Sequence, residues 1–125
     1  MTKATYRRKI RDAMKSLGVY RSEFDTAISQ LAELKESRDI TAERYEISGG
    51  LPVITHVNKS GASNLVKNPI LCVMDKMDEM ILKYMSELGL TPRGLLRLDK
   101  KGLKSRPSAS KLEGFLNDFV GGNAK

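Results

Sequence analysis

The strongest constraint on the fold is a long apolar helix that should begin at Asn68-Pro69. An Asn side chain can accept a hydrogen bond from the free amides of a first helical turn, and Pro at the first helical position loses none. After this start, six apolar residues recur at alternating steps of four and three, which keeps them on one helix face for roughly 30 Å. This stripe consists of Ile70, Met74, Met77, Ile81, Tyr84 and Leu88.

More apolar residues lie beside the stripe than one buried face needs. Five of them widen the apolar arc beyond the ~100° that a helix buries against a single core. They are Leu71, Val73, Met80, Leu82 and Met85. The sequence therefore predicts that identical copies associate, with the stripe at the oligomer interface. Cys72 is expected to be a small buried side chain rather than a reactive thiol.

The N-terminal part should contain a pair of helices. Apolar spacing predicts a helix over residues 4–17 that Gly18 ends. Ser22 and Asp25 together indicate a capped start for a second helix, which could run to about Ile47. The short link between the two helices is typical either of a helical hairpin or of a helix-turn-helix-like corner, and the sequence does not separate these alternatives.

Between the second helix and the apolar one, residues of about 51–67 should form a small β-hairpin. The segment Val53–Val57 has strand composition, residues 58–61 have turn composition, and Ser63–Lys67 can return as a second strand. Because a two-stranded hairpin is marginally stable alone, we expect it to lean on the apolar helix or on another subunit. The single histidine, His56, is expected on the strand surface rather than in a catalytic role.

Gly89 should end the apolar helix, and Thr91-Pro92 should start a shorter one. Residues 1–100 are thus expected to form a mainly α core that includes the hairpin. Residues 101–125 should follow as a linker and a short C-terminal helix. That helix could fold back on the core or dock on a partner protein through its apolar residues. These residues are Leu112, Phe115, Leu116 and Phe119.

The formal net charge of +7 is unevenly distributed along the chain. Residues 1–21 contain seven basic residues and one acidic residue, residues 22–47 seven acidic and three basic, and residues 91–125 eight basic and three acidic. Clustered Lys and Arg side chains neutralise phosphates and give DNA affinity that weakens with salt. The alternative is a basic face that only keeps the protein in solution. The candidate DNA-binding residues are Lys3, Arg7, Arg8, Arg11, Lys15 and Arg21.

The sequence contains no pattern typical of an enzyme. A phosphate-binding glycine loop, a pair of catalytic carboxylates and a nucleophile with its base are all missing. Asp75, Asp78 and Glu79 share part of a helix face, but we expect solvated carboxylates there rather than a metal site. One Cys and one His cannot form an internal disulfide or a structural zinc site. Without a long apolar run or a signal peptide, we expect a soluble cytoplasmic protein without a cofactor.

Two segments resemble one protein family. Residues 59–69 end in Asn64-Leu65-Val66-Lys67-Asn68-Pro69, and residues 86–95 contain Leu88-Gly89-Leu90-Thr91-Pro92. In this order, the two motifs resemble the small subunit of tailed-phage terminases, specifically the P twenty-seven family. The similarity is strongest over residues 59–98 and looser over residues 18–25.

The resemblance implies a non-catalytic subunit of a genome-packaging motor. Small terminase subunits form rings, recognise viral double-stranded DNA, and recruit or regulate a large subunit that carries ATPase and nuclease activity. The C-terminal apolar residues would then dock on the large subunit, in the host cytoplasm. The sequence departs from helix-turn-helix small terminases because it has no clear recognition helix. Two other hypotheses remain: a monomeric or dimeric DNA-binding regulator, and a structural adaptor that does not bind DNA.

Overall fold

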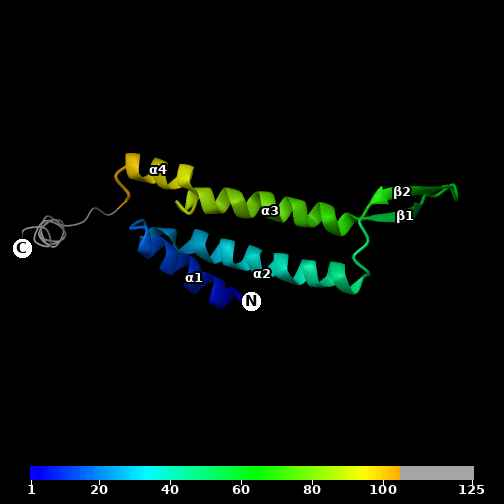
Figure 1. The fold of residues 1–125 in the computed structure, drawn as a ribbon, viewed down its shortest axis with the longest axis horizontal. Coiled ribbons are helices and arrows are strands. Elements are labelled where there is room, and N and C mark those ends of the chain that lie inside the picture. The colour runs from blue at the N-terminus through cyan, green and yellow to red at the C-terminus, as the bar shows by residue number, and fades with distance from the viewer. Residues whose placement is uncertain (105–125) are drawn as a thin grey trace, which may run out of the picture.

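The computed structural model describes residues 1–104, in which helices lie side by side as an elongated rod and a β-hairpin projects from one end (Figure 1). The elements are α1 (Lys3–Ser16), the short 3-10 helix η1 (Ser22–Phe24), α2 (Asp25–Ile47), β1 (Val53–Val57), β2 (Ser63–Lys67), α3 (Pro69–Glu87) and α4 (Pro92–Lys100). The predicted mainly α fold with one small hairpin is therefore confirmed. The expected C-terminal docking helix lies outside the described residues.

α1 and α2 form an antiparallel helical hairpin, which decides between the two alternatives left by the sequence (Figure 1). At one end of the pair, the backbone amide of Lys3 donates to Glu36 at 2.6 Å. At the other end, the Arg11 guanidinium lies 3.5 Å from Asp25. Gly18 adopts a φ of +73° and ends α1 in the left-handed turn that its position predicted.

The start of α2 differs from the prediction. η1 precedes α2, and the N-cap residue of α2, Phe24, makes no side-chain capping hydrogen bond. Asp25 was expected to complete a cap with Ser22. Its carboxylate instead accepts from the Tyr20 hydroxyl at 2.9 Å and from Arg11 at 3.5 Å. This acidic side chain therefore fastens α1 and the connecting link to α2.

Both predicted Pro-containing helix starts are confirmed. At Asn68-Pro69, the Asn side-chain oxygen accepts from the backbone amide of Ile70 at 3.1 Å, so α3 begins with a satisfied first turn. α3 ends at the predicted glycine, Gly89, which has a φ of +75°. α4 then begins with the Thr91 hydroxyl accepting from the Gly94 amide at 3.1 Å.

The β-hairpin is fixed at its turn and at its base, and no helix within residues 1–104 covers it. β1 and β2 pair antiparallel, with Thr55 opposite Leu65. At the turn, the Asn58 side chain accepts from two backbone amides and one hydroxyl. At the base, Lys67 forms an ion pair of 2.5 Å with Asp75 of α3. Beyond this base the strands project past the helices, and Leu65 is 78% exposed (Figure 1).

The hydrophobic core lies where α1, α2, α4 and the C-terminal end of α3 meet. Its buried members are Ile10, Met14, Val19, Ile28, Leu31, Ala32, Leu88 and Leu98. Two members of the stripe on α3, Met74 and Leu88, are buried, and the other four are half-buried. Ile81 and Tyr84 pack against the core. The stripe thus faces its own chain first, and its role as an interface between copies stays a prediction.

The expectation for Cys72 is wrong, because this side chain is exposed. Cys72 lies two residues after Ile70, which places it on the side of α3 opposite the stripe. Because apolar residues occur nearly all round α3, the sequence predicted burial on this side of the helix as well. We therefore place Cys72 outside the core.

Candidate nucleic-acid interface

Three of the predicted DNA-binding residues form an open cationic edge on α1. Arg7, Arg8 and Lys15 are exposed, and none of them forms an ion pair within residues 1–104. Arg8 and Lys15 are seven residues apart, so about two helical turns bring them to the same side. We call these three residues the free cationic edge.

The other three predicted residues are engaged in exposed ion pairs. Lys3 lies 3.6 Å from Glu33, Arg11 3.5 Å from Asp25, and Arg21 3.7 Å from Glu23. Exposed ion pairs are worth at most about 1 kcal/mol, so a DNA phosphate can compete for these cations. The structure therefore separates three cations that form no ion pair within residues 1–104 from three that must first release a carboxylate.

Tyr20 was not predicted as part of this region. Its ring lies under two cationic groups, 5.7 Å from the Arg11 guanidinium carbon and 5.2 Å from the Lys15 ammonium. Its hydroxyl donates to Asp25, and this hydrogen bond raises the Tyr20 pKa. Tyr20 belongs to the link after α1, so helical periodicity gave no signal that it lies beside Lys15.

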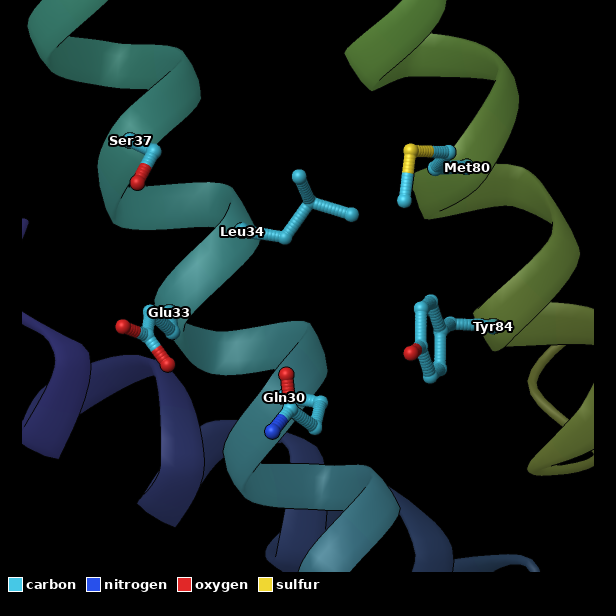
Figure 2. Close-up of a pocket in the computed structure, with 6 residues that line it drawn as sticks. All are labelled: Gln30, Glu33, Leu34, Ser37, Met80 and Tyr84. Carbon is cyan, nitrogen blue, oxygen red and sulfur yellow. The ribbon is translucent and has the colours of Figure 1, made fainter.

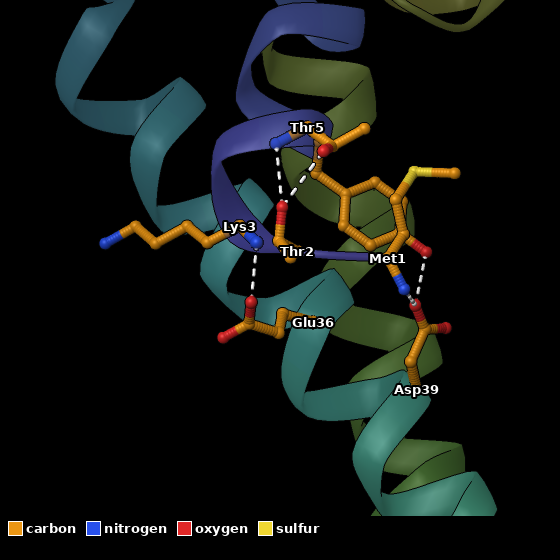
Figure 3. Close-up of polar contacts among 7 residues, drawn as sticks. Met1, Thr2, Lys3, Thr5, Glu36 and Asp39 are labelled. Carbon is orange, nitrogen blue, oxygen red and sulfur yellow. Dashed lines mark hydrogen bonds and ion pairs between the residues drawn. The ribbon is translucent and has the colours of Figure 1, made fainter.

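The N-terminal end of α1 is fixed to α2 by polar contacts (Figure 3). The Thr2 hydroxyl caps α1 by accepting from the Thr5 amide at 3.3 Å, while the Lys3 amide donates to Glu36. Three residues further along, the Tyr6 hydroxyl donates to Asp39 at 2.6 Å. α1 is therefore held to α2 near both of its ends, which fixes the direction of the free cationic edge.

The comparison with known proteins covers all of these elements. A family model described as phage terminase, small subunit, matches residues 2–104. The chain belongs to this family. The match confirms the resemblance and extends it from residues 18–25 and 59–98 to residues 2–104, which include α1 and its free cationic edge. No curated protein and no solved structure matches the chain.

Family membership gives this terminase small subunit a role in phage DNA packaging. The family generally supplies the non-catalytic subunit.

The carboxylates of α3 that share part of one helix face form ion pairs in the structure. Asp75 pairs with Lys67, Asp78 with Arg38 at 2.8 Å, and Glu79 with Lys76 at 3.5 Å. Hydrogen bonding to Asp78 raises the pKa of Arg38. Within residues 1–104, no group of three His, Cys, Asp or Glu side chains could hold a metal ion.

Three further expectations for this terminase small subunit concern its histidine, membrane-spanning helices and its C-terminal residues. His56 is exposed on β1, as expected for a strand surface residue. None of the helices within residues 1–104 has the length and apolar character needed to cross a membrane. The four expected large-subunit contacts, Leu112, Phe115, Leu116 and Phe119, lie outside the described residues.

The hydrogen bond between Tyr6 and Asp39 gives the protein a dependence on pH at both ends of the scale. Donation from Tyr6 lowers the pKa of Asp39 below its usual 3.8, and the same bond raises the pKa of Tyr6 above its usual 10.0. The lowered Asp39 pKa stabilises the fold above about pH 4, and this contribution is lost as pH falls through the folded-state pKa. The raised Tyr6 pKa stabilises the fold below about pH 10, and that contribution is lost as pH rises further.

Replacing Tyr6 by Phe should therefore lower the free energy of unfolding near neutral pH and have less effect at both extremes. Because the Asp39 side chain is 45% exposed, solvent screening limits the neutral-pH effect to about 0.5–1 kcal/mol. Urea unfolding of both proteins across the pH range measures this difference. The control is Tyr84→Phe, which removes a hydroxyl that makes no hydrogen bond within residues 1–104 and should change the free energy of unfolding little at neutral pH. A Tyr6→Phe effect of the same size at pH 3 and pH 7 would contradict the assignment.

Proposed function

We propose that this protein is the non-catalytic DNA-recognition subunit of a phage terminase. It binds viral double-stranded DNA as an oligomeric ring and recruits or regulates the large ATPase and nuclease subunit in the host cytoplasm. Membership of the terminase small-subunit family supports the packaging role. The observation that carries the proposed DNA contact is the free cationic edge of Arg7, Arg8 and Lys15, held on a fixed helix.

The edge is suited to phosphates and offers no side chain of the kind that reads adenine. α1 contains no Asn or Gln, the side chains that read adenine edges, whereas Arg and Lys bind phosphates along the DNA backbone. A ring repeats the same edge in every copy, and linked weak contacts raise the overall affinity through effective concentration. The proposed mechanism is therefore a repeated, salt-sensitive backbone contact.

Replacing Arg7, Arg8 and Lys15 together by Ala should weaken DNA binding at least about tenfold at low salt. Each lost phosphate contact removes about 0.9 from the slope of log affinity against log salt, so the slope should fall by about 2.7 for each copy that contacts DNA. Fluorescence anisotropy with double-stranded DNA over a salt series measures both quantities. Arg11 is left intact, because its ion pair with Asp25 belongs to the fold.

The matched control removes three exposed basic residues from other elements, through Arg44→Ala, Lys59→Ala and Lys76→Ala. This variant has the same net charge as the first, so a general loss of positive charge would weaken both equally. Equal affinities and slopes for the two variants would remove α1 as the contact. Complete absence of salt-sensitive DNA binding by the unmodified protein would favour the structural adaptor.

Solution mass tests the proposed ring independently of DNA. Light scattering should give a mass of several chains over a range of concentrations, because residues 1–104 leave part of the apolar surface of α3 uncovered. Val73, Met80 and Leu82 are 48%, 40% and 61% exposed. A mass of one or two chains would favour the monomeric or dimeric regulator.

The proposed large-subunit contact is tested separately, by comparing binding of the large subunit to the full chain and to residues 1–104.

A further inference from the structure

The rod has an apolar groove between α1 and α3. We call it the α1–α3 groove; its volume is about 390 Å³. Apolar side chains from both helices and the turn after α3 line it, among them Leu17, Met85 and Leu90. Its charged lining residues are Lys9 and Lys35, and Leu17 is 37% exposed at its edge. This side of the rod is therefore apolar with a positive rim.

A second groove lies on the other side of α3, where that helix meets α2 (Figure 2). We call it the α2–α3 groove; it consists of two adjoining hollows of about 270 and 230 Å³ that share Met80 and Tyr84. Figure 2 shows Leu34 reaching from α2 toward Met80 and Tyr84. The charged lining residues are Glu33, Glu87 and Lys83. This side is apolar with a mainly negative rim.

The two grooves lie at the same height along the rod. On α2, the consecutive residues Leu34 and Lys35 line the α2–α3 groove and the α1–α3 groove, respectively. On α3, Tyr84 lines the α2–α3 groove and the next residue, Met85, lines the α1–α3 groove. A contact that joins these two sides in neighbouring copies therefore requires a rotation with little shift along the rod. A small shift meets one requirement of a closed ring, whereas a large shift would build a filament.

Charge and size favour a second copy of the chain as the occupant. Glu33 and Glu87 are 59% and 61% exposed and each has one cation nearby, Lys3 at 3.6 Å and Arg97 at 3.5 Å. A carboxylate has about four acceptor positions, so a second cation from a neighbour can also bind. Each groove admits only a few side chains. Met80, which is 40% exposed and flexible, is suited to fill a groove of this size.

We propose that the two grooves are the two halves of one heterologous interface. Met80 and Tyr84 of one copy pack into the α1–α3 groove of the next, where Lys9 and Lys35 face the neighbour's acidic rim. This inference rests on the proposed ring and specifies its contact surfaces. It places the interface beside the α3 stripe, whose other members face α2 of their own chain.

The test uses one variant for each groove: Met80→Asp for the α2–α3 groove and Leu17→Asp for the α1–α3 groove. Each places a charge in a surface that the contact would desolvate, so neither variant should form rings alone. Each variant keeps one groove unmodified. An equimolar mixture should therefore give one-to-one pairs, in which the intact α2–α3 groove of the Leu17 variant binds the intact α1–α3 groove of the Met80 variant. Native mass spectrometry distinguishes these pairs by their mass.

Two controls separate loss of assembly from loss of folding. Leu96→Asp changes an exposed leucine of α4, 54% exposed, and should leave the ring intact. Circular dichroism of all variants should show unchanged helix content, because neither Met80 nor Leu17 belongs to the buried core. Lys9→Glu provides a second measurement that preserves the apolar surfaces. It should raise the concentration at which the ring dissociates several-fold, and more at low salt than at high salt.

The possible outcomes also separate this inference from the proposed ring. A monomeric unmodified protein would overturn both. Rings formed by the unmodified protein and by either Asp variant would overturn the groove assignment and leave the ring standing. A homodimer of one variant alone would indicate a symmetric contact and would likewise overturn the heterologous interface.

Discussion

Replacing Gly94 by Ala should detach α4 from α3 and destabilise the protein. The same substitution inside a helix normally stabilises it by about 0.5–1 kcal/mol, so the expected effect has the opposite sign. Gly94 is buried where α4 crosses the end of α3. A Cβ atom there would overlap the carbonyl oxygen of Ser86 and lie 2.9 Å from its carbonyl carbon. Both are backbone atoms, so no side-chain rotation can make room.

Displacement of α4 would remove two further contacts. The Arg97 guanidinium donates to the Ser86 carbonyl at 3.0 Å, and Leu98 is 4% exposed in the core. Exposing a leucine costs about 1.5–3 kcal/mol, and a hydrogen bond contributes about 1 kcal/mol. We therefore expect the free energy of unfolding to fall by about 3 kcal/mol in urea denaturation.

Arg93→Ala is the control for Gly94→Ala. Arg93 is the exposed preceding residue on α4, and its replacement should change the free energy of unfolding by less than about 0.5 kcal/mol. If Gly94→Ala unfolds at the same or a higher urea concentration than the unmodified protein, α4 does not cross α3 as closely as described.

Replacing Leu31 by Ala should have an effect of similar or greater size. Leu31 is fully buried on α2, in the cluster that joins α1, α3 and α4. Truncating such a leucine removes apolar burial and leaves a cavity, at a cost of about 2–5 kcal/mol. Because a domain is typically stable by only about 5–15 kcal/mol, this single change should lower the urea midpoint substantially.

Leu96→Ala makes the same chemical change at a site 54% exposed and should cost little. The difference between the two leucines isolates the effect of burial from that of the substitution itself. A cost below about 1 kcal/mol for Leu31→Ala would show that α2 does not contribute the central leucine of the core.

The sequence predicted most helix and strand boundaries, with the start of α2 as the exception, because interactions between neighbouring residues determine them. Asn68 and Thr91 cap helices through bonds to amides two or three residues away. Gly18 and Gly89 end helices because each supplies a positive φ within its own turn. Such signals lie within a few neighbouring residues, so they can be recognised without knowing the fold.

The partners of these elements were less predictable, because they are distant in sequence. Periodicity showed that one face of α3 is buried but not that α2 covers it. Asp25 was read as a helix cap, but Tyr20 and Arg11 converge on it once α1 folds back. The cluster of cations on α1 could be predicted from composition. The helical hairpin decides which of these cations form ion pairs, because it brings Glu33 beside Lys3 and Asp25 beside Arg11.

Tyr6 and Tyr20 hold α1 near its two ends through Asp39 and Asp25. Because this helix is already fastened, an approaching polyanion meets charges at set positions, and little conformational entropy is lost on contact. In the proposed ring, every copy would present those charges with the same spacing. The assembly would then respond to the curvature and phosphate repeat of the nucleic acid more than to its base order.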